Sequence, residues 1–573
     1  MNIFDKFLDK TKPLILINQK KLGIEKINEF KGITVESPPS EFNFDLSLNI
    51  SMVLAKINKQ NPKELAEKIK NLLTENLEDI STIEIAGPGF LNIKLTDASI
   101  KGFINGILTN KKTYGSTPSN KKYNIEFVSA NPTGPMHVGH CRGAIYGDVL
   151  ANLLKFNGND VTKEYYINDY GNQIENFTKS VFLRIREQKN NEKFINSKDL
   201  YPGEYIVNIA KNIINENKNF PFQNLEESYE LVREESLKHS MKMIKNDLEK
   251  LGIKHDYFFS ETELVKKNLV NKAIEILSKN NFVEEGYLEP PKGEEIKNWK
   301  KNKKLLFKST LFGDNSDRAL KKNDGTWTYF ANDIAYHLDK VSRNFDHLIN
   351  VLGADHTGYI KRISAAVDAL SNKKTKLECR VCQLVKLFKN GKPFKMSKRS
   401  GDFILASDLL NEVNKDSIRF MMLNRGNDVE LDFDFDKVLE KGKDNPVFYI
   451  QYCYARINSL FTNLKINLSD PIKLDKNFRI NSYEKKILRK IFDWPKVVLS
   501  ASKKYEPHRI PFYLYDLATL FHAYWSKGNE TDEFKFIIDG KLNNPSSLII
   551  IQVLAIVIQN GMNILGVSLP KKM

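Results

Sequence analysis

Residues 123–167 contain a strand, a turn, a helix and a second strand in immediate succession, and this unit limits the fold more than any other segment. The sequence YNIEFVSA predicts a strand, residues 131–135 a turn, and VTKEYYI the next strand. Apolar residues between them recur every three or four positions, the spacing of one face of a helix over 138–156: Val138, Cys141, Ile145, Val149 and Leu153. The unit therefore predicts a Rossmann-like parallel sheet, with ligand sites at the carboxyl ends of its strands.

Two histidines flank a glycine at the start of this helix, in NPTGPMHVGH. A helix N-terminus offers unpaired N–H groups and partial positive charge, which suit phosphate, and His137 and His140 can add imidazole donors. Gly139 would let a flat base or ribose approach the backbone. The alternative is a zinc pair, but no nearby carboxylate or cysteine completes its ligand set. We predict no structural metal.

A lysine-rich segment, KMSKR over 395–399, follows the strand and turn VKLFKNGK. Such a loop can close over a triphosphate and neutralise its leaving group. A charged loop is more often a solvated surface, and KMSKR alone does not distinguish the two interpretations. The histidine pair upstream and the lysine segment downstream, in this order, favour nucleotide chemistry.

The composition of the chain indicates which class of partner it binds and in which compartment it works. A net charge of +16 favours a polyanionic partner, although a genome bias towards Lys, Asn and Ile would also produce it. Four cysteines exclude a disulfide framework and suit a reducing cytoplasm, and we expect Cys379 and Cys382 in a buried strand. The stretch Leu548–Ile558 is very apolar, but it is shorter than the ~20 residues that span a bilayer. We predict a buried helix there and no membrane association.

The chain divides into three expected parts. Residues 1–110 predict an α+β module, and residues 446–573 are helical throughout. Between them, residues 111–445 predict the parallel-sheet domain, interrupted by a charged helical insertion at about 180–300. Strand signals return after the insertion in TWTYFANDIA, FDHLINVLGADH and VCQLVKLF.

The histidine pair and KMSKR together resemble the HIGH and KMSKS signatures of class I aminoacyl-tRNA synthetases. Longer motifs resemble the arginyl-tRNA synthetases of the bacterial type: EFVSANPTGPMHVGHCRGAIYGD, EYYINDYGNQI, GYLEPPKG, TYFANDIAYHLDK, GADHTGY and NPVFYIQYCYARI. The resemblance covers essentially the whole chain. Val138 replaces an isoleucine of the signature and Arg399 a serine, and both changes leave the histidines, the glycine and both lysines in place.

This resemblance implies an α/β fold with a class I Rossmann-like catalytic domain, an N-terminal module that touches tRNA and an all-α C-terminal anticodon-binding domain. It also implies a two-step reaction, in which arginine attacks the α-phosphate of ATP and the terminal ribose of tRNA(Arg) then takes the arginyl group. Catalysis would rest on positioning and charge stabilisation, with Mg²⁺ on the phosphates. The implied partners are L-arginine, ATP and tRNA(Arg), and we expect a cytoplasmic monomer.

The resemblance also assigns residues to roles. The catalytic phosphate ligands would be His137, His140, Lys395 and Lys398. ATP would contact Gly139, Gly353, Asp355, Met396 and Ser397. Arginine would contact Glu126, Ser129, Asn131, Tyr329, Asp333 and His356, and of these Glu126 and Asp333 would form a carboxylate clamp on the guanidinium. The HIGH region would run through Ala130, Asn131, Pro132, Thr133, Gly134, Pro135, Met136, His137, Val138, Gly139 and His140.

Two other functions compete with this interpretation. An enzyme of the same superfamily could join ATP to a small acid without RNA, but the positive charge and the helical C-terminal region would then have no purpose. A paralogue could bind RNA without chemistry, but both signatures and the arginine-contacting residues are intact.

Overall fold

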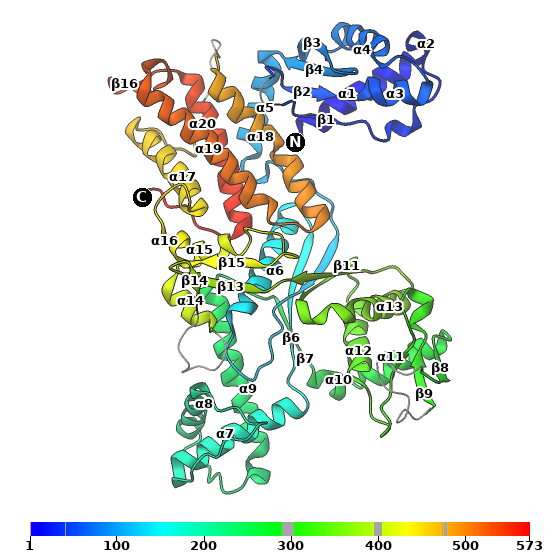
Figure 1. Cartoon of the computed structure of the whole chain (residues 1–573), viewed down its shortest axis with the longest axis vertical. Coiled ribbons are helices and arrows are strands. Elements are labelled where there is room, and N and C mark those ends of the chain that lie inside the picture. Colours follow the sequence, from blue (N-terminus) through cyan, green and yellow to red (C-terminus); the bar gives the residue numbers. More distant parts are fainter. Residues whose placement is uncertain are drawn as a thin grey trace. The chain divides into compact units, whose positions relative to one another are not determined.

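The computed structural model describes residues 2–39, 42–288, 303–394, 404–470, 472, 474 and 478–573. It divides into two compact units, and Figure 1 follows the chain through both. The parallel-sheet unit contains residues 118–440 and 506–508. The discontinuous unit contains residues 1–117, 441–505 and 509–573. The sequence of the parallel-sheet unit thus interrupts that of the other.

Five parallel strands form the centre of the parallel-sheet unit: β5 (Lys122–Glu126), β6 (Asp160–Ile167), β7 (Tyr257–Ser260), β11 (His347–Gly353) and β12 (Lys376–Cys382). Their order is β12-β11-β5-β6-β7, which confirms the predicted parallel sheet. The strand order reverses between β5 and β11, where Glu126 pairs with Asn350. Open α/β sheets bind ligands at the carboxyl ends of the strands at such a reversal.

Helix α6 (Val138–Phe156) connects β5 to β6 and matches the predicted range. Its first turn follows His137, and Gly158, with φ of +71°, adopts the left-handed conformation that favours glycine just beyond the helix end. The predicted apolar face is buried. Two buried charges also fix the helix: Arg142 donates to three backbone carbonyls, and Asp148 pairs with Lys163 and Arg419.

The expected single insertion at about 180–300 is instead two separate segments. Helices α7 (Asn172–Asn190), α8 (Glu204–Glu216) and α9 (Leu225–Lys250) pack around a hydrophobic core of their own. The chain then returns to the central sheet as β7. The second segment comprises α10 (Thr262–Lys266), α11 (Leu269–Lys279) and a small antiparallel sheet of β8 (Val283–Gly286), β9 (Lys304–Phe307) and β10 (Arg318–Ala319). The short helix η4 (Ser309–Phe312) lies between β9 and β10 in the chain. Strand β7 has only four residues, too few to show periodicity between charged helices.

One expected strand signal contains the start of a helix, and another is divided between two strands. TWTYFANDIA contains the start of helix α12 (Tyr329–Ser342), because the Thr328 side chain caps the helix by accepting from the Ala331 N–H at 3.3 Å. VCQLVKLF is confirmed as strand, and it contains the end of β12 and all but the last residue of β13 (Val385–Lys389), which belongs to another sheet with β14 (Lys392–Pro393) and β15 (Leu431–Asp434). Cys379 and Cys382 do lie in a strand, and their spacing of three directs them to opposite faces.

Short helices complete this unit and frame the sheet. They are η5 (Ala354–Tyr359), α13 (Ile360–Ser371), α14 (Ala406–Glu412), α15 (Lys415–Met421) and α16 (Phe435–Leu439).

The discontinuous unit begins with an α+β region. It contains α1 (Ile3–Ile17), α2 (Gln19–Leu22), η1 (Asn28–Phe30), α3 (Ile50–Asn58), α4 (Pro62–Asn76), α5 (Asp97–Asn110) and η2 (Lys111–Thr113). An antiparallel sheet in the order β1-β2-β4-β3 is formed by β1 (Val35–Glu36), β2 (Leu46–Leu48), β3 (Ile80–Ala86) and β4 (Phe90–Leu95). The C-terminal region contains α17 (Pro446–Asn463), α18 (Ser482–Lys504), α19 (Arg509–Glu530), η7 (Asp532–Phe534), the hairpin β16 (Ile537–Ile538) and β17 (Lys541–Leu542), and α20 (Pro545–Leu565).

These two regions pack directly on each other. The Trp494 indole N–H donates to the Tyr114 carbonyl at 2.9 Å, and the Tyr114 hydroxyl donates to the Ile491 carbonyl at 3.1 Å. Gly115 has φ of +97°, a backbone conformation that favours glycine, and a Cβ there would lie 2.3 Å from the Trp494 ring. Both the backbone conformation and the close contact therefore require glycine at this position. The expected N-terminal and C-terminal parts therefore share one unit.

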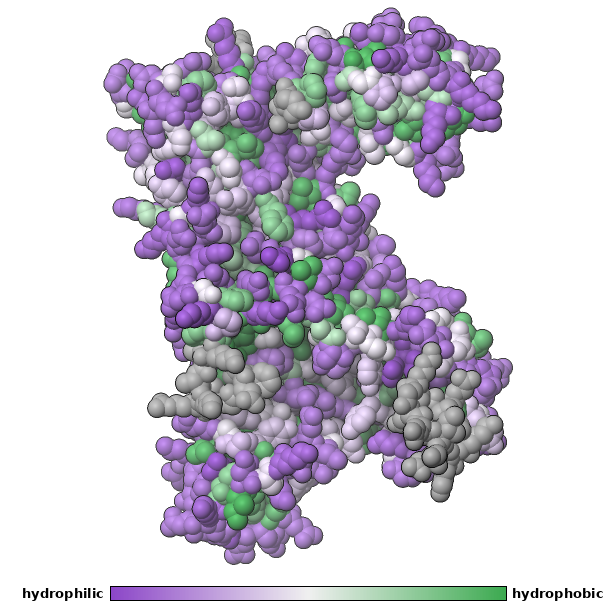
Figure 2. All heavy atoms as spheres, in the orientation of Figure 1, coloured by the Kyte–Doolittle hydropathy of each residue, from purple (hydrophilic) through white to green (hydrophobic). Residues whose placement is uncertain are grey.

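Helix α20 contains the apolar stretch predicted to be a buried helix, and it is one. It is long and apolar enough to cross a membrane by length and composition alone, but most of it is buried against α17, α18 and α19. This is the environment of a core helix. Figure 2 shows that hydrophilic residues cover most of the visible face of the protein, with hydrophobic residues scattered among them.

Candidate active site

The two histidines contact each other at the start of α6. The backbone N–H of His137 donates to Nδ1 of His140 at 3.2 Å, and the ring centroids lie 3.7 Å apart. Burial lowers the pKa of both rings, and the pKa of His140 falls to about 3 because the neighbouring His137 adds to the effect of burial. Both rings are therefore neutral near pH 7. Because Nδ1 of His140 accepts a hydrogen bond, its proton is on Nε2, which can donate to a phosphate oxygen.

Gly139 leaves this helix terminus open. The residue is exposed, and a Cβ at its position would lie 2.9 Å from Cε1 of His137. Any side chain here would push the His137 ring aside. The glycine therefore has two effects. It lets a ligand approach the backbone at the start of α6, and it leaves room for the His137 ring.

The turn that leads from β5 to the histidines has a strained backbone. Val128 and Ser129 have φ values of +71° and +41°, a conformation that a β-branched residue rarely adopts. Side chains hold it in place: the Ser129 hydroxyl donates to Glu126 at 3.1 Å and accepts from the Tyr166 N–H at 3.1 Å. Asn131, further along, donates to Gln173 at 2.8 Å. The turn thus fixes the direction in which the chain enters α6.

The chain just after the lysine-rich segment lies against the histidine pair. The Val138 N–H donates to the Ile404 carbonyl at 2.9 Å, and the Ala406 N–H donates to the Met136 carbonyl at 2.8 Å. His137 and Leu405 form an antiparallel bridge between these bonds. Lys395, Met396, Ser397 and Lys398 lie outside the described residues, and residues 404–406 lie beside His137.

Three acidic residues form a cluster near the carboxyl end of β5. Burial, with repulsion from Glu261 and Glu126, raises the pKa of Asp333 to about 7. Burial also raises the pKa of Glu261 to about 6, although this side chain accepts from Asn332 at 3.3 Å. The same carboxylates and burial raise the pKa of the Tyr166 hydroxyl, which therefore stays protonated. We call Glu126, Glu261 and Asp333 the carboxylate cluster. A cation bound among them would offset the repulsion between their negative charges.

Glu126 differs from the other two because it already has a buried cationic partner. Lys340, fully buried on α12, donates to Glu126 at 2.5 Å and to Asn350 at 3.0 Å. Asn350 contacts Nε2 of His337 at 3.0 Å, and Nδ1 of His337 contacts the Asp333 carbonyl at 2.8 Å. Glu126 and Asp333, the expected clamp, lie close enough for the Glu126 charge to add to the raised pKa of Asp333, and Glu261 joins them with a raised pKa of its own. The clamp itself stays a prediction. The sequence reasoning missed Glu261 and Lys340.

The remaining expected site residues lie on exposed surface. Tyr329 begins α12 with 70% of its surface exposed, and the Lys322 ammonium lies 5.4 Å from its ring centroid. Asp355 and His356 are exposed in η5, where their side chains lie 3.4 Å apart. Gly353 ends β11, and a Cβ there would meet the Asp355 carboxylate at 2.7 Å. The structure does not bring Tyr329, Asp355 or His356 into contact with the buried cluster.

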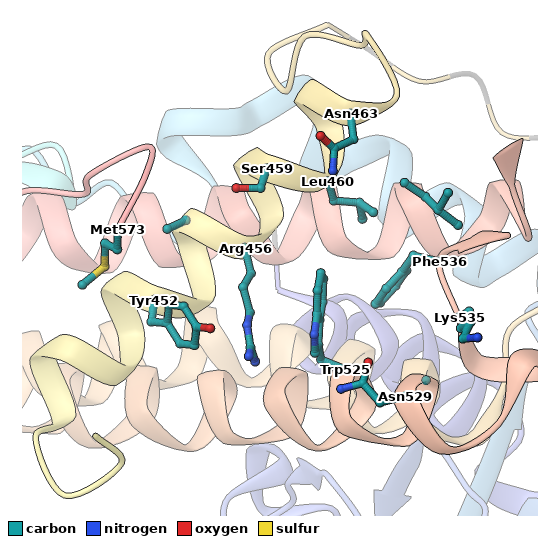
Figure 3. A pocket seen from close by; sticks show the side chains of 13 residues that line it. Tyr452, Arg456, Ser459, Leu460, Asn463, Trp525, Asn529, Lys535, Phe536 and Met573 are labelled. Atoms are coloured by element: carbon teal, nitrogen blue, oxygen red, sulfur yellow. The ribbon is translucent and has the colours of Figure 1, made fainter. Parts of the chain in front are cut away.

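A second candidate site lies in the discontinuous unit, between α17 and α19. This C-terminal pocket encloses about 610 Å³ and is shown in Figure 3. The Arg456 guanidinium lies 4.2 Å from the Tyr452 ring centroid and 5.1 Å from that of Trp525. The other lining residues are Ala455, Ser459, Leu460, Asn463, Gly528, Asn529, Lys535, Phe536, Ile537 and Met573. Flat rings, two cations and two amides suit an unstacked nucleobase and its phosphate.

Comparison with known proteins shows similarity along the whole chain. Three family models match in succession: the arginyl-tRNA synthetase N-terminal domain over residues 12–95, the catalytic domain of class I tRNA synthetases (R) over 103–459, and the DALR anticodon binding domain over 450–573. The chain is 53% identical over 577 residues to the arginine–tRNA ligase of Pelagibacter ubique and 44% identical over 589 residues to that of Bartonella bacilliformis, with all of each chain covered. Its fold matches Thermus thermophilus arginyl-tRNA synthetase with a TM-score of 0.70 at 19% identity, covering 98% of this chain and 99% of that one.

Proposed function

This chain belongs to the class I arginyl-tRNA synthetase family, and from that premise we propose how its residues divide the ligation of arginine to tRNA(Arg). The enzyme activates L-arginine with ATP to arginyl-adenylate and pyrophosphate, and it then transfers the arginyl group to the 3′-terminal ribose, releasing AMP. No covalent enzyme intermediate is needed, so its residues act by binding, orientation and charge stabilisation.

The raised pKa values of Asp333 and Glu261 are the observation that carries the assignment of the arginine site. A guanidinium offers a planar set of donors and a permanent charge, which would relieve the repulsion between these two carboxylates. Glu126, held by Lys340 at the strand end that leads to the histidines, is suited to the α-ammonium group. Ser129 and Asn131 would support the α-carboxylate end, with Tyr329 and His356 at the exposed side.

The phosphates of ATP would lie at the start of α6. Neutral Nε2–H groups of His137 and His140 would donate to the phosphate oxygens, and Lys395 and Lys398 would neutralise the leaving pyrophosphate. Met396 and Ser397 belong to the same segment, and Gly139, Gly353 and Asp355 would face the nucleoside. Mg²⁺ would enter with ATP as part of the substrate.

The tRNA would use the discontinuous unit. In the C-terminal pocket, Tyr452 and Trp525 would stack an unpaired anticodon base, while Arg456 and Lys535 contact its backbone. The N-terminal α+β region would contact the tRNA elbow. We expect the enzyme to work as a monomer in the cytoplasm.

Arginine-dependent ATP–pyrophosphate exchange, measured with and without tRNA(Arg), tests this function. We expect exchange with arginine and none with citrulline, which has nearly the same shape without the charge, and we expect exchange to require tRNA. Exchange without any transfer to RNA would indicate a ligase of the same superfamily that does not use tRNA. Binding of tRNA without exchange would indicate a paralogue that has lost its chemistry.

A further inference from the structure

The three-helix segment α7–α9 carries a group of metal-ligating side chains that arginine ligation does not use. Glu216 ends α8, and Glu235 and His239 lie one turn apart on α9. One ligand atom from each residue lies within 4.8 Å of the other two. Nε2 of His239 is 3.3 Å from an Oε2 of Glu216 and 3.9 Å from Oε2 of Glu235.

The imidazole of His239 shows that this group is more than a set of surface carboxylates. The residue is only 7% exposed, and its Nε2 is buried without a hydrogen bond to any residue that the structure describes. Buried side-chain nitrogens normally have a partner, because leaving one unpaired costs about 1–3 kcal/mol. The nearest oxygen is Oε2 of Glu216, 3.3 Å away, and the two form a charged pair only when the imidazole is protonated. An ion between the three side chains would use the unpaired nitrogen.

Two of the three ligand separations are close to those around a tetrahedral metal ion. Zinc bonds to imidazole and carboxylate of about 2.0–2.2 Å place neighbouring ligands roughly 3.3 Å apart. The distance from His239 to Glu216 has this value already, and that from His239 to Glu235 needs only a small side-chain movement. Three protein ligands would leave the fourth position for water.

Lys238 occupies the neighbouring space when no ion is bound. Its ammonium lies 2.8 Å from Glu235 and 3.4 Å from Glu216, so it balances the two carboxylates. The side chain is 62% exposed and can turn into solvent without breaking a packed core. A metal ion would therefore replace one cation by another at the same carboxylates.

We propose that Glu216, Glu235 and His239 bind one divalent transition-metal ion, for which Zn²⁺ is the best match. Oxygen and imidazole ligands suit zinc, whereas Mg²⁺ requires oxygen ligands. The ion joins the end of α8 to the middle of α9 and so stabilises the α7–α9 segment. Nothing in the site touches the histidine pair or the carboxylate cluster, so arginine activation does not depend on it.

Zinc titration of the metal-free full-length protein, followed by calorimetry, tests the proposal. We expect one Zn²⁺ per chain, and binding weakened at least about tenfold in Glu235→Gln and in Glu216→Gln. Glu234→Gln, with the same charge change at an exposed neighbouring position, should bind zinc like the wild type. Lys238→Met should bind zinc at least as tightly, because the competing ammonium is gone. Mg²⁺ should not compete.

A second measurement guards against misfolding and against zinc bound elsewhere. Co²⁺ bound by the wild type should show the intense visible absorption of a tetrahedral site, and this should be lost in His239→Ala whose circular dichroism is unchanged. The chain has nine histidines and four cysteines, so zinc binding that Glu235→Gln and Glu216→Gln leave unchanged would overturn the proposal. The absence of any zinc binding would do the same. Arginine-dependent pyrophosphate exchange, measured on the same variants, keeps this result separate from the proposed function.

Discussion

The carboxylate cluster and the C-terminal pocket use charge in opposite ways. In the cluster, carboxylates are grouped together, and burial raises the pKa values of Asp333 and Glu261, with repulsion from neighbouring carboxylates adding to the effect. In the C-terminal pocket, Arg456 and Lys535 line an open cavity beside aromatic rings. The first arrangement suits one small cation of fixed shape. The second suits a large polyanion whose bases can be unstacked.

This difference shows what burial of charge contributes. Water and salt screen exposed charges, so the C-terminal pocket can attract RNA but cannot by charge alone distinguish one base from another. Buried carboxylates are poorly screened and leave a large penalty when the ligand is neutral. We expect a site of this kind to reject an uncharged isostere of arginine by binding alone, without a separate hydrolytic site.

Salt should separate the two regions most strongly. Raising monovalent salt from about 50 to 200 mM should weaken tRNA(Arg) binding on the order of 10²-fold, because basic side chains displace counterions from the phosphates. The apparent affinity for arginine should change little over the same range. Filter binding and calorimetry would measure the two affinities. A tRNA affinity that is independent of salt would remove the contrast.

The next largest effect should come from the carboxylates. Asp333→Asn and Glu261→Gln should each raise the arginine concentration needed for half-maximal exchange about 30-fold or more, since breaking a desolvated charge pair costs ~2–5 kcal/mol. The ATP requirement and tRNA affinity should stay near those of the wild type. Asp324→Asn, at an exposed turn before α12, is the matched control. If Glu261→Gln left the arginine requirement unchanged, the clamp would again consist of Glu126 and Asp333.

In the C-terminal pocket, Trp525→Ala should weaken tRNA(Arg) binding about tenfold, because stacking one base contributes ~1–3 kcal/mol. Trp525→Phe keeps a flat ring and should retain most of the affinity. The arginine requirement should not change in either variant. An equal loss of arginine affinity would show that the two sites are not independent.

The smallest effect should appear with pH. In the proposed site arginine binds the charged carboxylates, so its affinity should rise severalfold between about pH 5.5 and 7.5, through the pKa values of Glu261, about 6, and Asp333, about 7. In the arginine-free protein, the raised pKa values make the free energy of unfolding fall as the pH increases. The contribution of the two protonated carboxyl groups is complete below their pKa in the unfolded chain, near 4, and is lost as the pH rises through about 6 to 7. Calorimetry near pH 6.5 in buffers of different ionisation enthalpy should show proton release on binding. Heats that do not depend on the buffer would contradict this.

Sequence patterns were sufficient where the local signals agreed with the fold. Helix α6 matches its predicted range because its apolar spacing, the histidine turn and Gly158 all indicate the same boundaries. The start of α12 was misjudged because the β-forming residues of TWTYF precede the helix, and only the cap by Thr328 sets its first turn. Glu261 gave no signal, since it follows a four-residue strand inside a charged region. Its role depends on the sheet order, which one short strand does not reveal.

The metal-ligating group was beyond sequence reasoning for a related reason. Glu216 lies 19 residues before Glu235 on a different helix, so no local spacing connects it to His239. The expected division into separate N-terminal and C-terminal parts likewise missed contacts between residues far apart in the chain. Removing residues 446–573 would therefore expose Tyr114 and its neighbours as well as remove the C-terminal pocket, and point variants are the cleaner test.

The contact between Trp494 and Tyr114 has a consequence for how the protein is made. Its two partners are 380 residues apart, with residues 118–440 of the parallel-sheet unit between them. At a synthesis rate of roughly 5–20 residues per second, the N-terminal region leaves the ribosome on the order of 20–75 seconds before its partner helix exists. During that interval Tyr114 and Phe103, which later contact α18, have no surface to cover them. Completion of this unit therefore has to wait until α17–α20 have been synthesised.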